Sequence, residues 1–147
     1  MADYLAAPAA RTRPYPGVPE TLAALRADGW RLAVCTNKPR AVSIAILDAL
    51  GLAPLFGAVI GGDSTPARKP DPRPLRAALA AIGIDATRAV MIGDGAHDAE
   101  AAAAAGVAFV GVDYGYGAAG LGALRPRPRI ISRFADLPAA LPRTPDR

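Results

Sequence analysis

The chain has 147 residues, of which 52% are hydrophobic, and its formal net charge at pH 7 is +4. This length suits one domain with a sizeable core, and no apolar run approaches the roughly 18 residues that a membrane span needs. The positive charges are scattered and do not interleave with aromatic residues, so we expect neither nucleic acid nor a membrane as a partner. The single cysteine, Cys35, excludes an internal disulfide. The single cysteine and the lack of a secretory signal pattern at the N-terminus together favour a cytoplasmic location.

Helical patterns alternate with short, nearly continuous apolar runs. Such runs are typical of parallel strands that are covered on both faces. The elements predicted in chain order are a helix at 19–28, a strand at 30–36, a helix at 39–50, a strand at 56–62, a helix at 74–82, a strand at 89–93, an alanine-rich helix, a strand at 107–112, a short strand at 129–131 and a helix near 134–141. This order predicts an α/β fold, a Rossmann-like three-layer α/β/α domain with a mainly parallel sheet.

Polar residues follow each of the four longer strands, at the edge where ligands bind in such sheets. These segments begin at Thr36, Asp63, Asp94 and Asp113. The same residue types commonly cap helices and form turns, so a structural role is favoured for any one of them. Because all four segments are expected at the same edge of the sheet, a binding site is the alternative to these structural roles.

Asp94 and Asp98 predict a metal site. Two carboxylates, one at a strand end and one in the first turn of the next helix, can converge on one cation. Mg²⁺ needs only one or two carboxylates beside waters and phosphate oxygens. We expect Asp94 to be the direct ligand. Asp98 either ligates, directly or through water, or stabilises the helix N-terminus electrostatically.

Two further segments predict a phosphate site. The stretch CTNKP places the Thr36 hydroxyl and the backbone N–H groups around Asn37 beside a helix start, which suits an anion. In the stretch RKPDP, Lys69 lies in a proline-rich loop beyond a strand, where its ammonium can neutralise a phosphate and nearby carboxylates.

Together and in this order, these segments resemble the haloacid dehalogenase (HAD) superfamily, and most closely its phosphoglycolate phosphatase branch. The motifs that carry the resemblance are YPGV, TNKP, GGDSTPARKPDP, GDGAHD and VDYGYG, and it covers about residues 12–141. It implies Mg²⁺-dependent hydrolysis of a small phosphomonoester through an aspartyl-phosphate. The expected partner is therefore a small phosphorylated metabolite. The expected cofactor is Mg²⁺, bound weakly or not at all by this chain. The loop at 113–117 matches a segment that flanks the active-site entrance.

The resemblance also implies roles for individual residues. Thr36 and Asn37 match the phosphate-binding position, and Lys69 matches the lysine that orients phosphate and nucleophile. Thr36 and Lys69 are thus the expected catalytic residues. Asp94 matches the metal-binding acid and Asp98 its supporting acid.

The first motif of the family is missing from this sequence. In the family, a strand ends in Asp-x-Asp-x-Thr, whose first Asp attacks phosphorus and whose second acts as general acid and base. The sequence contains no Asp-x-Asp. We expect residues 1–16 to be the remnant of a cap-domain helix and a linker, 17–142 an incomplete HAD-like core, and 143–147 a disordered tail. Without the nucleophile, we expect this chain to be inactive by itself.

The missing strand would lie in the centre of the sheet, between the strands predicted at 30–36 and 89–93. Several unpaired backbone groups there, at about 1–3 kcal/mol each, would rival a total stability of about 5–15 kcal/mol. The two strands could pair directly, residues 2–15 could fill the gap, or another chain could supply a strand in a homodimer or as a complementing partner. Pro8 and Pro14 disfavour the second outcome. We expect direct pairing or filling by another chain.

Three interpretations of function follow. The first is a phosphoglycolate phosphatase-like hydrolase domain that lacks its nucleophile. The second is a non-catalytic phosphate- or metal-binding module, or a subunit that pairs with a chain supplying the missing strand. The third is a dinucleotide-binding oxidoreductase domain, which requires a Gly-x-Gly-x-x-Gly fingerprint after a strand, and we expect none here.

Overall fold

The computed structural model describes residues 17–114, 118–124 and 127–141. The predicted linker at 1–16, the predicted tail at 143–147 and residues 115–117 of the entrance loop lie outside the described residues. The elements are α1 (Val18–Ala27), β1 (Ala33–Cys35), α2 (Arg40–Leu50), η3 (Ala53–Leu55), β2 (Ala58–Ile60), α3 (Arg73–Ile82), η4 (Ala86–Arg88), β3 (Val90–Gly93), α4 (Ala96–Ala105), β4 (Ala108–Val112), η5 (Ala118–Ala123), β5 (Arg129–Ile131), η6 (Phe134–Asp136) and α5 (Leu137–Ala140), where η marks a 3₁₀-helix.

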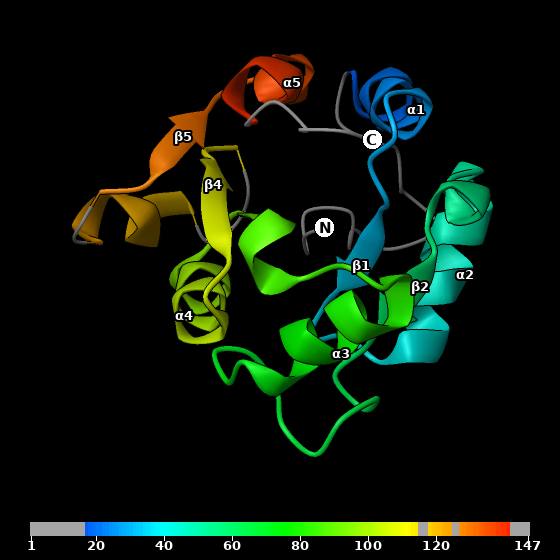
Figure 1. Cartoon of the computed structure of the whole chain (residues 1–147), viewed down its shortest axis with the longest axis horizontal. Coiled ribbons are helices and arrows are strands. Elements are labelled where there is room, and N and C mark those ends of the chain that lie inside the picture. The colour runs from blue at the N-terminus through cyan, green and yellow to red at the C-terminus, as the bar shows by residue number, and fades with distance from the viewer. Residues whose placement is uncertain (1–16, 115–117, 125–126, 142–147) are drawn as a thin grey trace.

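The strands form two parallel sheets (Figure 1). β1 pairs with β2, with Val34 opposite Val59, and the second sheet has the order β3-β4-β5, with Ile92 opposite Val110. This confirms the predicted α/β architecture with parallel strands. The strands are shorter than the apolar runs, because such runs report burial rather than pairing. Leu32, for example, is buried but precedes β1.

Prolines and glycines set the bounds of the helices. α2 follows Pro39 and ends before Gly51, whose φ of 71° lets the chain reverse. α3 carries a proline in its first turn and ends before Gly83, with φ of 68°. Glycine is the residue that adopts this left-handed conformation at least cost. The helices predicted at 39–50 and 74–82 therefore hold to within one residue. Within the described residues, no helix has the length and hydropathy to cross a bilayer.

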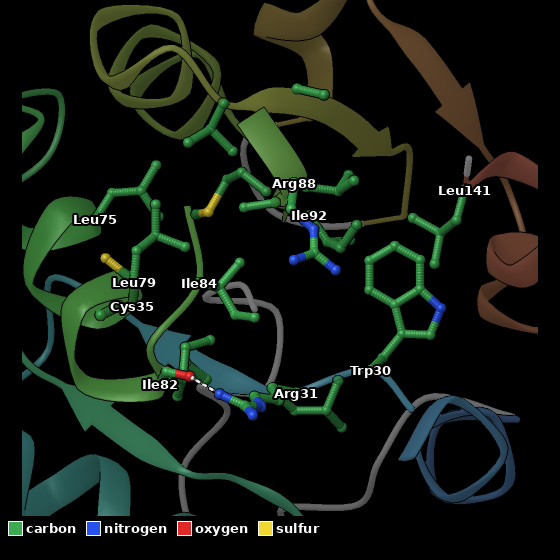
Figure 2. A pocket seen from close by; sticks show the side chains of 18 of the residues that line it. Trp30, Arg31, Cys35, Leu75, Leu79, Ile82, Ile84, Arg88, Ile92 and Leu141 are labelled. Atoms are coloured by element: carbon green, nitrogen blue, oxygen red, sulfur yellow. Dashed lines mark hydrogen bonds between the residues drawn. The ribbon is translucent and has the colours of Figure 1, made fainter. Parts of the chain in front are cut away.

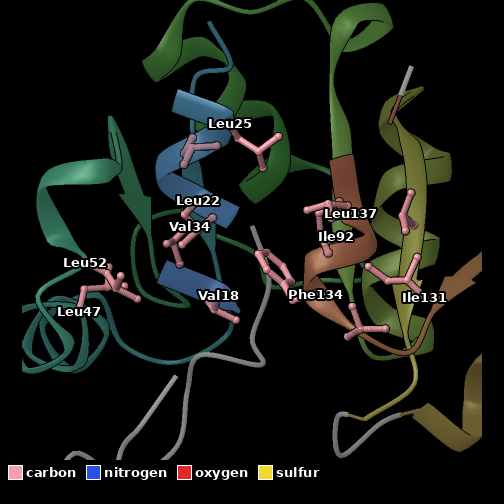
Figure 3. Packing of buried hydrophobic residues seen from close by; sticks show 13 residues of the cluster. Val18, Leu22, Leu25, Val34, Leu47, Leu52, Ile92, Ile131, Phe134 and Leu137 are labelled. Atoms are coloured by element: carbon pink, nitrogen blue, oxygen red, sulfur yellow. The ribbon is translucent and has the colours of Figure 1, made fainter. Parts of the chain in front are cut away.

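Alternate residues of β1 and β3 point into two separate cores. Val34 of β1 and Ile92 of β3 belong to a first cluster, with residues from α1, α2, η6 and α5. Cys35 of β1 and Met91 of β3 belong to a second cluster, with residues from α3 and α4. Because both strands contribute to both cores, the two sheets lie in one layer between two helical layers. In the first cluster, Phe134 lies between the side chains of α1 and β1 and those of β3 and β5 (Figure 3).

The prediction that β1 and β3 pair directly is wrong. Among the described residues, β1 pairs only with β2, and β3 pairs only with β4. Helices span the interval on both faces, because α3 packs on β1 and on α4 while α1 packs on η6 and on α5. Direct pairing would require both helical layers to repack. Filling by residues 2–15 falls outside the described residues, and filling by another chain stays a prediction.

Replacing Phe134 with alanine is expected to lower the free energy of unfolding by about 3–5 kcal/mol, because it opens a cavity in the core that both sheets share. The Phe134 side chain is 1% exposed. Chemical denaturation followed by circular dichroism measures the change. The control is Val42→Ala, at a side chain that is 48% exposed, where we expect a shift within about 0.5 kcal/mol. Equal shifts in the two variants would contradict this account of the core.

Candidate functional site

Four of the predicted site residues meet at the carboxyl ends of β1 and β3. Thr36 directly follows β1, and Asp94 directly follows β3. Lys69 comes from the loop before α3, and Asp98 lies in the first turn of α4. All four are buried, with exposed fractions between 2% and 8%. Buried polar side chains that converge at this edge of a parallel sheet are the expected sign of a ligand site.

A buried ion pair joins the two sheets at this edge. Lys69 Nζ lies 2.6 Å from Asp98 Oδ1 and donates a second hydrogen bond, 2.8 Å long, to the backbone oxygen of Cys35 at the end of β1. The side chains of Lys69 and Asp98 are 0% and 3% exposed. Removing either partner would leave the other charge buried and uncompensated. The pair therefore fixes the ammonium beside the end of β1.

The other oxygen of Asp98 reaches the end of β3. Asp98 Oδ2 accepts a 3.2 Å hydrogen bond from the backbone N–H of Asp94. Gly93 permits this close approach, because a Cβ on Gly93 would lie 2.6 Å from Asp98 Cγ and overlap the rest of that side chain. The glycine of the Gly-Asp pair thus has a steric role that motif matching did not single out. One carboxylate therefore contacts both Lys69 and the first residue after β3.

The side chain of Asn37 holds the Lys69 loop from the β1 side. Asn37 Nδ2 donates a 3.1 Å hydrogen bond to the Lys69 backbone oxygen, and the Lys69 N–H donates a 3.0 Å bond to Asn37 Oδ1. Both polar atoms of the Asn37 side chain therefore bind the backbone of Lys69. Beside it, Thr36 Oγ1 accepts a 3.2 Å bond from the Lys38 N–H. The phosphate contacts predicted for this segment rest on the Thr36 hydroxyl and on backbone N–H groups.

The two glycines after β2 bring the next loop against the same segment, a role that was not predicted from the sequence. A Cβ on Gly61 would lie 2.6 Å from Arg40 Cα, and one on Gly62 would lie 2.9 Å from the Asn37 carbonyl carbon. Asp63, next in the chain, accepts a 2.9 Å hydrogen bond from the Arg40 N–H and so caps α2. For Asp63, the structure therefore shows a capping role, which is the kind of role favoured for any one polar residue that follows a strand. The signal for this packing is the Gly-Gly-Asp sequence itself.

The two acids differ in how well they suit a metal. Both oxygens of Asp98 accept hydrogen bonds from protein donors, which suits a residue that orients its neighbours. Asp94 offers a hard carboxylate directly after β3. Within the described residues, no group of three or more His, Cys, Asp and Glu could hold a metal, but Mg²⁺ shared with a phosphate needs only one or two carboxylates. The donor set thus fits Mg²⁺, and the metal roles of Asp94 and Asp98 stay predictions.

A second acid in the Lys69 loop, Asp71, serves helix α3. Its carboxylate accepts hydrogen bonds from the backbone N–H of Arg73, 2.9 Å long, and from the Arg73 guanidinium, 3.0 and 3.1 Å long. The side-chain bond from Arg73 is the main cause that lowers the pKa of Asp71, and the same contact raises the pKa of Arg73. A lowered carboxyl pKa stabilises the fold above the usual value and loses that effect as pH falls through the lowered value. Because the pair is exposed, its contribution is small.

The expectation that no dinucleotide fingerprint follows a strand is wrong. Residues 115–120, GYGAAG, have the spacing Gly-x-Gly-x-x-Gly. In dinucleotide-binding folds this fingerprint lies in the first strand-to-helix turn and opens an α-helix. Here it follows β4, the fourth strand, and leads into the short 3₁₀-helix η5. The oxidoreductase interpretation therefore gains no support from it.

Comparison with known proteins agrees with the resemblance seen in the motifs. The sequence model of the family described as haloacid dehalogenase-like hydrolase matches residues 2–106. The phosphoglycolate phosphatase of Caulobacter vibrioides is 53% identical over 113 residues, which are 77% of this chain and 48% of that protein. The phosphoglycolate phosphatase of Cereibacter sphaeroides is 46% identical over 143 residues, which are 97% of this chain and 64% of that protein.

The fold matches solved structures as well. The crystal structure of a predicted phosphoglycolate phosphatase from Haemophilus somnus superposes with a TM-score of 0.81 at 39% sequence identity. The match covers 88% of this chain and 58% of that chain. This chain therefore spans about half to two thirds of the length of the relatives that it matches.

Replacing Lys69 with methionine is expected to lower the free energy of unfolding by about 3–5 kcal/mol, because Asp98 would stay buried without its cation. The matched control is Lys38→Met, at the only other lysine, which is exposed. We expect that control to shift stability by no more than about 0.5 kcal/mol. Urea denaturation of the three proteins measures both shifts. A Lys69→Met protein as stable as the control would show that the ion pair does not hold the two sheets together.

Proposed function

Because the chain belongs to the haloacid dehalogenase-like hydrolase family, we propose that it carries the phosphate- and Mg²⁺-binding residues of a phosphoglycolate phosphatase-like site. We propose further that this chain does not turn over substrate by itself. The substrate class is a small phosphomonoester, as the names of the relatives suggest.

One observation carries the proposal: a continuous set of hydrogen bonds links Asn37, Lys69, Asp98 and Asp94, and it reaches the residue before Thr36. Asn37 holds the backbone of Lys69, and Lys69 bonds the residue that precedes Thr36. Lys69 also pairs with Asp98, whose second oxygen bonds the Asp94 N–H. Residues from three separate segments, 36–37, 69 and 94–98, thus form one arrangement. A set of unrelated caps and turns would not need such links.

Each residue has a distinct task in the proposed site. The Thr36 hydroxyl and the nearby backbone N–H groups bind phosphate oxygens, and the Lys69 ammonium supplies positive charge that the buried ion pair keeps in place. Asp94 would hold Mg²⁺, which when bound would neutralise charge on the phosphate. Asp98 orients Lys69 and the Asp94 backbone. These tasks are binding and orientation, and none of them supplies a nucleophile.

The missing nucleophile is the reason to expect no turnover. The sequence contains no Asp-x-Asp, and covalent phosphoryl transfer cannot begin without the attacking carboxylate. Asp94 is a poor substitute, because a metal-bound carboxylate is electrostatically occupied.

The second candidate function is a non-catalytic binding module or a subunit completed by another chain. The interval between β1 and β3, which no described strand fills, favours this candidate. Both candidates would bind phosphate and Mg²⁺ through the same residues. Turnover of substrate by the chain alone would contradict both, because it would identify the chain as an active enzyme.

The purified chain is expected to release no inorganic phosphate from phosphoglycolate or from an aryl phosphate at saturating Mg²⁺. The Asp94→Asn variant sets the background, and the Cereibacter sphaeroides relative serves as the positive control. The measurement is a phosphate-release assay at substrate concentrations up to the millimolar range. Turnover of about 1–10³ per second that disappears in Asp94→Asn would refute the claim that this chain is inactive alone.

Mg²⁺ binding is expected to be weak and to depend on Asp94 more than on Asp98, because both Asp98 oxygens are already engaged by protein donors. Calorimetric titration in the presence of inorganic phosphate compares Asp94→Asn, Asp98→Asn and the control Asp85→Asn. Asp85 lies at the opposite end of β3 and caps η4, a role that asparagine can take over. Affinity should fall at least about ten-fold in Asp94→Asn. Tight binding that survives Asp94→Asn would remove Asp94 from its assigned role.

A further inference from the structure

Three segments pack together directly beside the proposed phosphate site, and Gly62 lies at the point where they meet. The Gly62 N–H donates a 2.7 Å hydrogen bond to the backbone oxygen of Lys38. A Cβ on Gly62 would lie 2.9 Å from the Asn37 carbonyl carbon and 3.2 Å from Nε of Arg68. The Arg68 guanidinium therefore packs against Gly62, next to the segment that directly follows Thr36.

The backbone on both sides of the Arg68 side chain is held by hydrogen bonds. Arg68 O accepts a 2.9 Å bond from the Asp71 N–H, and the Asn37 side chain binds both the N–H and the C=O of Lys69. The Lys69 side chain enters the buried ion pair with Asp98, whereas the Arg68 side chain is exposed. Two consecutive cations of one loop thus lie at the site, one inside it and one on its solvent side.

The Arg68 guanidinium differs from other arginines near the sheet in what it binds. Arg31 donates a 2.7 Å hydrogen bond to Ile82 O at the end of α3 (Figure 2), and Arg40 Nε donates a 3.1 Å bond to Val59 O. Within the described residues, the Arg68 side chain forms neither such a bond nor an ion pair. Its place is set by packing, and its hydrogen-bond donors are available to a ligand.

The local charges near Arg68 favour an anionic group. Asp63, the acid closest to it in the chain, caps α2 and forms no ion pair with Arg68. Lys38 is exposed and likewise forms no ion pair within the described residues. The Lys38 N–H bonds Thr36 Oγ1, so this lysine belongs to the segment that is proposed to bind phosphate. Two cations without a paired carboxylate raise the local potential for a negatively charged ligand.

The geometry of a guanidinium favours a carboxylate over other anionic groups. Its planar fork of N–H donors matches the two oxygens of a carboxylate, whereas an ammonium acts as a point charge. Arg68 packs beside Asn37, the residue after Thr36, and consecutive Cα atoms lie about 3.8 Å apart. A carboxylate that reached Arg68 from a phosphate at Thr36 would therefore need only a short spacer.

We propose that Arg68 is a specificity residue, which binds a carboxylate of the ligand beside the phosphate site. Arg68 would select small phosphomonoesters that carry a carboxylate on a short carbon spacer, and Lys38 would add positive charge on the same side. The inference rests on the proposed function, because it takes the phosphate to lie at Thr36. It adds a contact that none of the five predicted site residues provides.

The test compares two esters of nearly equal size, phosphoglycolate and 2-hydroxyethyl phosphate, in which a hydroxymethyl group replaces the carboxylate. Titration of the full chain with Mg²⁺ present, followed by ³¹P NMR, measures both dissociation constants and that of inorganic phosphate. The unmodified chain is expected to bind phosphoglycolate about two- to five-fold more tightly than the hydroxyethyl ester, as for an exposed charge pair. High salt should reduce this preference.

Substitutions separate a contact with the carboxylate from an effect of net charge. Arg68→Gln should abolish the preference and leave both the affinity for inorganic phosphate and the free energy of unfolding unchanged. Arg68→Lys should keep part of the preference, because the charge remains while the planar fork is lost. The matched control is Arg26→Gln, at an exposed arginine in the last turn of α1, which ends before β1 begins and so lies toward the opposite edge of the sheet. This control loses the same charge and should keep the full preference.

Equal binding of the two esters by the unmodified chain would overturn the assignment of Arg68. A preference that survives Arg68→Gln, or that falls equally in Arg26→Gln, would do the same. Weaker binding of inorganic phosphate in Arg68→Gln would place Arg68 in the phosphate site itself and would also overturn the proposal. If the chain binds none of the three ligands, the proposed function fails and this inference fails with it. Binding of inorganic phosphate without a preference between the esters contradicts the inference alone.

Discussion

The ion pair between Lys69 and Asp98 is the contact on which the rest of the site depends. It is the one described ion pair that is fully buried, and it ties the end of β1 to the end of β3. Burying two charges is costly unless both are hydrogen-bonded. Here Cys35 O and the Asp94 N–H supply the further bonds. The arrangement is therefore best understood as a device that fixes position, since a hydrophobic pair would fill the same space without placing an ammonium beside Thr36.

Much of the fold and the site could be predicted from the sequence, because both are carried by local signals. Apolar runs placed the parallel strands, and glycine and proline placed the ends of α2 and α3. The convergence of Thr36, Lys69 and Asp94 followed from parallel strands ending at one edge. Contacts between distant segments could not be predicted this way. Two examples are the hydrogen bonds between the Asn37 side chain and the Lys69 backbone, and the close packing of Gly93 against Asp98. Both depend on the positions of loops, which no periodic pattern of apolar residues encodes.

The incorrect prediction of direct pairing has a physical lesson. It weighed the backbone groups of β1 and β3 and left out the helices that pack on them. α3 contacts β1, β2 and α4, and α1 contacts η6 and α5, so the spacing of the two strands is set by layers of side chains. Burial of those side chains contributes about 25 cal/mol per Å² of apolar surface. The helical layers therefore oppose direct pairing of β1 with β3, which would form backbone hydrogen bonds over only a few residues.

The division of the sheet also bears on how the chain reaches its structure. β1, α2 and β2 form one unit of contiguous sequence, and β3, α4 and β4 form another. Each unit can close through contacts between near neighbours in the chain, which keeps the entropy of loop closure low. A strand that pairs with both β1 and β3 would be the element that couples the two units. Among the described residues, the docking of the two units depends on α3, on the shared cores and on one buried salt bridge. The two halves are therefore expected to unfold as separate units.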